Sequence, residues 1–247
     1  KEKLFAQQTK EDYLVLNYDD AHTRSMAERA HSTICFFSRQ QELAEGAFVA
    51  DGQLVIRWQG VLHPILPAAE LRIMGGHNVE NALAASAVAF LAGAEPAKIA
   101  GVLRSFSGVE HRIEPVIEIH GVMYYNDSKA TNTDSAIKAL ESFDDHIILI
   151  AGGDDKMTDL TDFMQLVKAR VDELILVGNA AARFREAALQ EGFAAAHIHE
   201  AGYSMQEAVD IAHRLAAPPQ VVLLSPACAS FDMFDGYEER GRVFKDL

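Results

Sequence analysis

The second half of the chain alternates short apolar runs with amphipathic segments, and this alternation limits the fold more than any other feature. Apolar runs at 147–151, 173–178 and 221–224 are separated from one another by helix-like segments. Strand–helix–strand units at this spacing favour a mostly parallel sheet with helices on both faces. The sequence therefore predicts an α/β domain, entered through a hairpin at 115–127, with helices over 133–142, 158–170, 180–190, 204–216 and 237–246.

The first half, up to about Gly108, has a less regular pattern. Two short apolar runs predict strands, with a helix over 21–30 between them, and 52–60 predicts an exposed strand or hairpin arm. A glycine pair opens an alanine-rich helix, and a second helix follows with Pro96 in its first turn. The two strands lie at 13–17 and 33–38 and the two helices at 75–94 and 95–106. Residues 1–8 resemble the middle of a helix, so we expect the sequence to be a piece of a longer protein.

The charge balance and the cysteines limit the partners. The chain has 22 basic and 36 acidic residues, a net charge of −14, which is the opposite of what a nucleic-acid backbone attracts. Its longest uncharged apolar stretch, 81–94, is shorter than the roughly 20 residues of a membrane span. Two distant cysteines, Cys35 and Cys228, make a zinc site or disulfide framework improbable and suit a reducing cytoplasm. We expect a cytoplasmic monomer that binds neither nucleic acid nor membrane.

Three polar loops follow predicted strands and should gather at one edge of the sheet, where ligands bind in such folds. In "NDSKATN", Asp127 and Lys129 stand two apart and can share one side of an extended segment. An acid beside an amine suits a nucleotide, with the carboxylate on ribose or a polarised water and the ammonium on phosphate. An ordinary turn and helix cap, with both charges in solvent, explains the pattern equally well.

The other two loops are "GGDDK" at 152–156 and "SPACAS" at 225–230. The first reads most simply as a glycine turn with solvated charges. In the second, small residues let a ligand approach the backbone, and a helical turn beginning over 229–232 would direct its N–H groups at an anion. Cys228 could instead be a nucleophile, but no histidine is placed beside it.

Other polar residues carry weaker signals. Asn78 and Asn81 lie one turn apart at a helix start, where they suit a purine edge or a ribose but also an ordinary cap. Arg112, near the junction of the halves, could reach a phosphate or form a salt bridge with a neighbouring glutamate. His197 and His199 suit a metal site less well than a surface strand end. No GxxxxGK[ST] or GxGxxG motif is present, so a phosphate loop for ATP is not in this chain.

Five motifs, found in order along the whole chain, resemble those of the Mur ligases of peptidoglycan synthesis. They are "GGHNVENALAA", "HRIE", "NDSKATN", "GGDDK" and "SPACASFDMFDGYEERG". The resemblance implies that 1–109 is the last part of a central ATPase domain and that 110–247 is a C-terminal Rossmann-like domain that binds the incoming amino acid. It also implies that a UDP-binding domain and the phosphate loop lie upstream. The other readings are another Mur-type or folylpolyglutamate-type amino-acid ligase, or a non-catalytic module that binds a nucleotide or amino acid.

The resemblance also implies a reaction and its residues. ATP, with Mg²⁺, would phosphorylate the carboxylate of UDP-N-acetylmuramoyl-L-alanine, and the amine of D-glutamate would attack the acyl phosphate. Asn78 and Asn81 would contact the adenine, and Arg112, Asp127 and Lys129 would contact ATP and act in catalysis. The D-glutamate pocket would comprise Thr131, Lys156, Ser230, the Phe231 amide and, where the family often has phenylalanine, Tyr237. By its spacing before Leu4-Phe5, Lys1 would be the carbamylated lysine that helps to hold magnesium.

Overall fold

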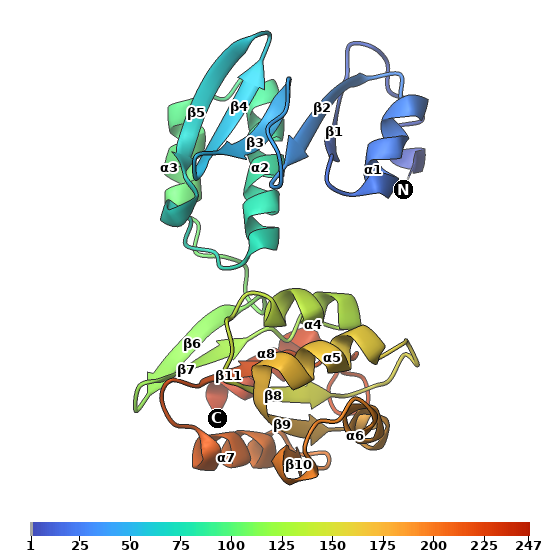
Figure 1. The fold of residues 1–247 in the computed structure, drawn as a ribbon, viewed down its shortest axis with the longest axis vertical. Helices are drawn as coiled ribbons and strands as arrows, with labels where there is room; N and C mark the ends of the chain where they lie inside the picture. The colour runs from blue at the N-terminus through green and yellow to red at the C-terminus, as the bar shows by residue number, and fades with distance from the viewer. Residues whose placement is uncertain (1) are drawn as a thin grey trace. The chain divides into compact units, whose positions relative to one another are not determined.

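The computed structural model describes residues 2–247 and divides the chain into two compact units (Figure 1). Unit 1 ends at Ser107 and unit 2 comprises Gly108–Leu247. The change from one unit to the next falls two residues before the boundary expected from the sequence. Each unit has its own sheet and its own core, so the α/β class is confirmed.

Unit 1 contains a five-stranded sheet in the order β1-β2-β3-β4-β5. β1, β2 and β3 are parallel, whereas β4 and β5 join the sheet as antiparallel neighbours. The strands are β1 (Tyr13–Asn17), β2 (Thr33–Ser38), β3 (Gly46–Ala50), β4 (Gln53–Trp58) and β5 (Val61–Pro67). The sequence did not predict β3 and β5. β5 contains two prolines, which a sheet tolerates at its edge, and the edge is where β5 lies.

Two helices pack on this sheet through small and aliphatic side chains. They are α2 (Gly76–Leu91) and α3 (Pro96–Ser105), and the core between them and the sheet includes Leu54, Leu83 and Ile99. The remaining helical segments are α1 (Ala21–Ser25) and the 3₁₀ turns η1 (Glu2–Leu4), η2 (Met26–Arg29) and η3 (Ala68–Glu70). The expectation of a helix over 1–8 was wrong for the described residues, because only η1 forms there before the chain turns away.

Unit 2 contains a six-stranded sheet in the order β10-β9-β8-β11-β7-β6. Every neighbouring pair is parallel except the hairpin of β6 and β7. The strands are β6 (Glu114–Ile119), β7 (Val122–Asn126), β8 (Ile147–Gly152), β9 (Val171–Val177), β10 (Ile198–Glu200) and β11 (Val221–Leu224). β8 is buried along its whole length, as its unbroken apolar sequence predicts for a strand covered on both faces.

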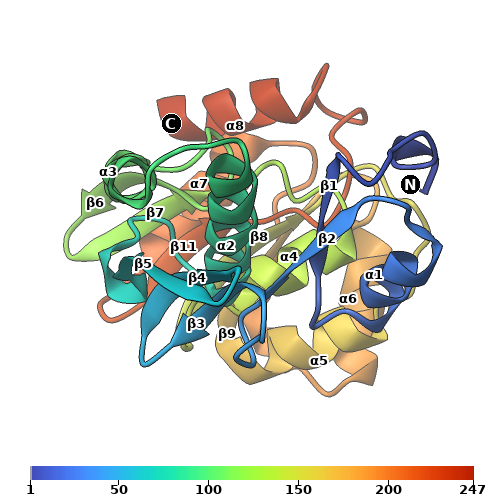
Figure 2. The ribbon, with the colours of Figure 1, turned by 90° about the horizontal axis from the view of Figure 1, so that it is seen from above.

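Helices cover both faces of this sheet. α4 (Thr133–Leu140), α5 (Thr161–Arg170) and α6 (Ala181–Gln190) pack on one face, against a core that includes Leu149. α7 (Met205–Leu215) and α8 (Tyr237–Asp246) pack on the other, against a core that includes Ile148. Figure 2 shows α5 and α8 on opposite sides of the strands, and the short turn η4 (Ala195–His197) leads into β10.

One predicted helix begins later than expected. α5 starts at Thr161 and not at residue 158, because the Asp159 carboxylate accepts hydrogen bonds from the Thr161 amide and hydroxyl and so ends the preceding loop. No helix among residues 2–247 is long and apolar enough to cross a membrane.

Candidate functional site

The carboxyl ends of β7, β11 and β8 lie level with one another in the sheet of unit 2. Leu224 of β11 stands opposite Asn126 of β7 and Ile150 of β8 in the register. The three loops that follow are joined by backbone hydrogen bonds from Asp127 to Leu224 (2.8 Å), from Gly152 to Pro226 (2.9 Å) and from Asp154 to Ala229 (2.9 Å). The structure thus brings the three polar loops together at one edge of the sheet.

Asp127 is buried at this edge, with 6% of its surface exposed. Its carboxylate accepts hydrogen bonds from the Ser225 hydroxyl (2.8 Å) and the Ile113 amide (3.3 Å). Burial raises the pKa of Asp127 to about 7, although these hydrogen bonds and the nearby Arg112 and Arg240 oppose the shift. The solvated turn that the sequence also allowed is therefore wrong for Asp127.

The expectation that Asp127 and Lys129 share one side of an extended segment was wrong. The chain turns here, since the Ala130 amide donates to the Asp127 carbonyl (2.9 Å). The turn directs the Asp127 carboxylate toward Ser225 and the Lys129 ammonium toward Tyr237. A spacing of two places side chains together only where the backbone stays extended.

Asp127→Asn should change how stability depends on pH. Because the folded protein keeps the Asp127 proton up to about pH 7 and an unfolded chain loses it near 3.8, its stabilising contribution is complete below pH 4 and is lost as the pH rises to 7. The asparagine variant has no such loss. Urea unfolding should show its stability gaining on the wild type by about 2–3 kcal/mol between pH 5 and pH 8.

The matched control is Asp134→Asn, an exposed acid in the first turn of α4. Urea unfolding of this variant at pH 5 and pH 8 gives the reference change for removal of one exposed acid. An equal difference for Asp127→Asn at pH 5 and pH 8 would contradict the raised pKa.

Lys129 is held against the first residue of α8. Its Nζ donates to the Tyr237 hydroxyl oxygen (2.6 Å) and lies 3.9 Å from the centre of the Tyr237 ring. The neighbouring Ser128 hydroxyl donates to the Tyr237 carbonyl (2.8 Å). The loop after β7 is therefore fixed to α8 at two consecutive residues.

Arg240 is the site residue that the sequence analysis missed. Its side chain is buried, with 1% exposed, and reaches from α8 into the space between two of the loops. Its guanidinium donates to the hydroxyl and carbonyl of Ser128 and to the carbonyls of Cys228 and Ala229, at 2.8–3.1 Å. Burial lowers its pKa to about 10. The signal was in the sequence, because Arg240 belongs to the quoted terminal motif, but nothing in that pattern showed that it points inward.

A second group of buried side chains lies at the start of the loop after β7. The Asn126 amide lies 2.9 Å from His111 Nδ1 and donates to the Glu114 carboxylate (3.0 Å). Burial lowers the pKa of His111, and its ring meets the Tyr237 ring edge to face, with centroids 5.9 Å apart. Arg112, next to it, is exposed to solvent and belongs to unit 2.

The "SPACAS" segment leads into a single helical turn that begins at Ser230, within the range 229–232 that the sequence suggested. Ala229 makes an antiparallel bridge with Asp154, and the turn begins at Ser230, whose carbonyl accepts from the amides of Met233 (3.1 Å) and Phe234 (2.8 Å). Ser230 is buried, whereas the Phe231 side chain is 71% exposed. The first N–H groups of such a turn point away from it, as at a helix start.

Cys228 is an inert thiol and not a nucleophile. It is 2% exposed, and burial raises its pKa to about 12. Because the thiolate is the reactive form, a thiol this weakly acidic has little reactivity at neutral pH.

The charged residues of the glycine loop after β8 lie in different surroundings. Asp155 forms a two-pronged ion pair with Arg183 (2.6 and 2.9 Å), which holds the pKa of Asp155 below its usual range, while Lys156 projects into solvent. Gly153 has φ +131°, and a Cβ on it would lie 2.4 Å from the Ala229 carbonyl oxygen. A glycine is therefore required for the loop to approach "SPACAS" this closely.

Thr131 and Asn132 end the loop that follows β7. The Thr131 amide donates to the Lys129 carbonyl (2.8 Å), and the Asn132 side chain caps α4 by accepting from the Ser135 amide (2.8 Å). Thr131, half-buried, thus stands between the Lys129 turn and a helix start.

Asn78 and Asn81 lie in the first two turns of α2 in unit 1. The Asn78 amide donates to the Met74 carbonyl (2.6 Å), and the Asn81 amide donates to Asn78 Oδ1 (3.1 Å). Gly75, the N-cap residue, has φ +91°. The two carboxamides therefore lie on one face, as the i, i+3 spacing predicted.

His197 and His199 flank a single carboxylate. Glu173 lies 2.8 Å from His197 Nδ1 and 2.7 Å from His199 Nε2. Within residues 2–247 no three histidine, cysteine or acidic side chains are arranged to hold a metal ion. Lys1, expected to hold magnesium as a carbamate, lies outside the described residues.

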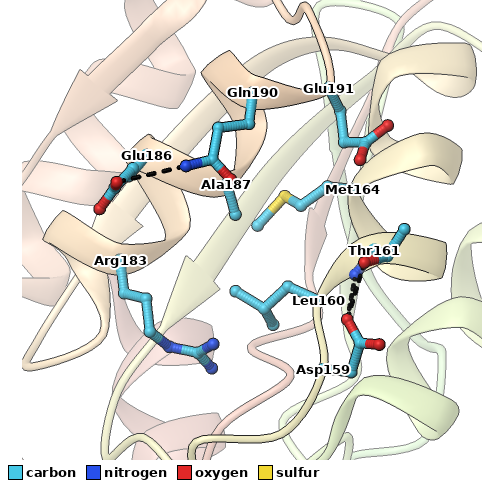
Figure 3. A pocket seen from close by; sticks show the side chains of 9 residues that line it. All are labelled: Asp159, Leu160, Thr161, Met164, Arg183, Glu186, Ala187, Gln190 and Glu191. Carbon is cyan, nitrogen blue, oxygen red and sulfur yellow. Dashed lines mark hydrogen bonds between the residues drawn. The ribbon is translucent and has the colours of Figure 1, made fainter.

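A cavity of about 300 Å³ lies between α5 and α6 (Figure 3). Leu160, Met164 and Ala187 line it together with polar and charged side chains, and Gln190 donates to Glu186 across one side. The loop after β8 contributes Asp159 and Leu160 to this cavity, and the lining residue Arg183 is paired with Asp155 of the same loop. The loops after β7 and β11 contribute no lining residue.

Comparison with protein families identifies both units. The model of the Mur ligase middle domain matches residues 1–89, and that of the Mur ligase glutamate ligase domain matches residues 111–228. The chain belongs to the Mur ligase family, and the resemblance seen in its motifs is confirmed.

The chain is also similar over its whole length to curated proteins of this family. The chain is 46% identical over 247 residues to a UDP-N-acetylmuramoylalanine–D-glutamate ligase of Pelotomaculum thermopropionicum, which covers 100% of this chain and 54% of the relative. It is 45% identical over 245 residues to the protein of the same name from Thermoanaerobacter sp. strain X514, covering 99% and 54%. The chain thus spans about half the length of the curated relatives it matches.

Solved structures share the fold at low sequence identity. UDP-N-acetylmuramoylalanyl-D-glutamyl-2,6-diaminopimelate–D-alanyl-D-alanyl ligase from Acinetobacter baumannii matches with a TM-score of 0.66 and 17% identity over 100% of this chain and 53% of its own. Folylpolyglutamate synthase from Mycobacterium tuberculosis matches with a TM-score of 0.61 and 16% identity over 90% and 52%. At these identities the likeness concerns the fold alone.

Proposed function

We propose that this chain is part of an ATP-dependent ligase that adds D-glutamate to UDP-N-acetylmuramoyl-L-alanine in peptidoglycan precursor synthesis. The whole-chain identity of 45–46% to relatives named for that reaction supports the substrate assignment. The observation that carries the proposal is the single edge at which three loops present Lys129, Lys156 and Ser230. Amines and a hydroxyl gathered there suit a nucleotide phosphate and a dicarboxylic amino acid.

We assign Lys129 and Arg112 to the phosphates of ATP. Their charges would stabilise negative charge on the phosphoryl group as it passes to the substrate carboxylate. Asp127 would contact ribose or a polarised water, and its burial makes it sensitive to the charges around it. In unit 1, Asn78 and Asn81 would contact the adenine.

The D-glutamate pocket would lie where "GGDDK" meets "SPACAS". The hydrogen bond from Asp154 to Ala229 brings Lys156 and Ser230 within a few residues of each other on paired segments. Lys156 would act as the counter-charge to a carboxylate bound by the Ser230 hydroxyl and the Phe231 amide. Thr131 and Tyr237 would complete the pocket from the loop after β7 and from α8.

ATP and magnesium would supply the phosphoryl group and the divalent charge for activation of the carboxylate. No phosphate-loop motif is present in the sequence. The part we assign to this chain is to contact the adenine, to bind the incoming amino acid and to deliver positive charge. Keeping water from an acyl phosphate gives such an enzyme a reason to close around it.

The proposed location is the cytoplasm. Both cysteines are free thiols, as is usual for proteins of reducing compartments. A monomeric state stays a prediction.

The test is phosphate release by the full-length protein with ATP, Mg²⁺ and UDP-N-acetylmuramoyl-L-alanine, across a panel of amino acids. Release is expected with D-glutamate and not with L-glutamate, L-lysine or meso-diaminopimelate. Release with another amino acid of the panel would overturn the substrate assignment while leaving the ligase class. No release with any of them would favour a non-catalytic binding module.

A further inference from the structure

Tyr237, the first residue of α8, uses its hydroxyl within the site. The oxygen of that hydroxyl accepts a hydrogen bond from Lys129 Nζ at 2.6 Å. A phenylalanine would offer Lys129 the ring face but no acceptor. The contact therefore depends on the hydroxyl oxygen of this one side chain.

The Glu238 carboxylate, next along α8, adds negative charge near this contact. The neighbouring Tyr237 hydroxyl and the positive charge of Lys129 hold the pKa of Glu238 below its usual range. The attraction between Glu238 and Lys129 therefore favours an ammonium that stays beside the Tyr237 hydroxyl.

The tyrosine is itself fixed on several sides. The edge-to-face contact with His111 holds its ring, and the Ser128 hydroxyl holds its carbonyl. Arg240, one turn further along α8, ties the same helix to Ser128 through its hydroxyl and carbonyl. The Tyr237 hydroxyl therefore has a fixed position near the carboxyl end of β7.

A lysine side chain gains more from such a fixed hydrogen-bond partner than an arginine side chain does. Its ammonium is a point charge on a flexible four-carbon stem, and holding that stem in one conformation costs side-chain entropy. One of the three N–H donors of Lys129 is directed at Tyr237, which leaves two for a ligand. Orientation before binding raises the fraction of enzyme that is ready to react.

We propose that Tyr237 is a positioning residue that holds the Lys129 ammonium ready for the transferring phosphoryl group. The proposal rests on the role assigned to Lys129 above. The Tyr237 hydroxyl acts through Lys129 and makes no contact with substrate, whereas its ring can border the amino-acid pocket as a phenylalanine would.

Kinetics of the full-length enzyme test the consequence. Tyr237→Phe removes the hydroxyl and keeps the ring, and kcat is expected to fall about tenfold, in keeping with loss of a hydrogen bond to a charged group. The KM for D-glutamate should stay within about twofold. Tyr203→Phe is the matched control, because its hydroxyl also makes a 2.6 Å hydrogen bond, to Asn179, on an exposed side chain; its kcat should not change.

Two kinetic results would overturn the proposal. An unchanged kcat in Tyr237→Phe would show that the hydroxyl does not position Lys129. A change confined to the KM for D-glutamate would show that the hydroxyl binds the amino acid.

Lysine labelling of the chain itself tests the contact without any catalysis. Reductive methylation read by mass spectrometry should modify Lys129 several-fold faster in Tyr237→Phe than in the wild type, because the amine loses its acceptor. Lys138, an exposed lysine paired with Glu141 on α4, serves as the internal reference. Glu238→Gln should give a smaller increase in the same direction.

An unchanged Lys129 rate in Tyr237→Phe would overturn the proposal whatever the kinetics show. Failure of the wild-type enzyme to release phosphate would count against the proposed function instead. The two failures are therefore distinguishable.

Discussion

Arg240→Ala is expected to destabilise unit 2 by about 3–5 kcal/mol. The carbonyls of Ser128 and Cys228 accept hydrogen bonds from the Arg240 guanidinium and would lose this donor. Each buried acceptor left without a donor costs about 1–3 kcal/mol. The Ala229 carbonyl keeps the Asp154 amide and adds less. A void left by a side chain that is 1% exposed adds to the loss.

Hydrogen exchange in increasing urea, read on peptides from β8 and β11, measures this loss within unit 2. The matched control is Arg242→Ala, an exposed arginine two residues away on the same helix, which should change stability by less than about 0.5 kcal/mol. If Arg240→Ala lowered stability no more than this control, the hydrogen bonds from Arg240 to the two loops would contribute nothing to folding. Arg240→Met separates the two causes, since it restores most of the volume and none of the donors.

The central strands of the unit 2 sheet were accessible from sequence because β8, β11 and the end of β9 are continuous apolar runs. Ile147–Gly152 is buried on both faces and carries no competing pattern. The strands missed in unit 1 are of another kind. β3 is a five-residue strand that opens with Gly46, and β5 is interrupted by Pro64 and Pro67, so neither has the composition that predicts a strand. Their neighbours in the sheet decide their conformation.

The candidate site also has one feature that the sequence predicted and others that it could not predict. The gathering of the three loops followed from the strand–helix alternation of a parallel sheet and from the rule that ligands bind at the carboxyl ends of its strands. The directions of individual side chains did not, because they depend on φ and ψ at single residues. The turn at 127–130 separates Asp127 from Lys129, and the burial of Arg240 depends on carbonyls contributed by residues 11 and 12 positions earlier and by Ser128, 112 positions earlier. A local pattern cannot show contacts over such separations.

Lys129→Ala is expected to lower kcat of the full-length enzyme about 10²–10³-fold, the loss typical when one preorganised donor to a developing charge is removed. The fold should survive, because the Lys129 amide still donates to the His111 carbonyl (3.0 Å) and Arg240 still holds Ser128. Phosphate release under saturating ATP and D-glutamate measures the effect, and thermal unfolding confirms that the variant is folded. Lys138→Ala, at an exposed lysine on the neighbouring helix, should retain wild-type turnover.

Binding of D-glutamate distinguishes a lost charge from a distorted pocket. Calorimetric titration of Lys129→Ala should give a D-glutamate affinity within about twofold of the wild type, since Lys156 and Ser230, which we assign to the amino acid, follow β8 and β11. A variant with turnover within about threefold of the wild type would remove Lys129 from the reaction. A variant that lost D-glutamate binding together with turnover would place Lys129 in the amino-acid pocket, with Thr131 and Tyr237, and not at the phosphoryl group.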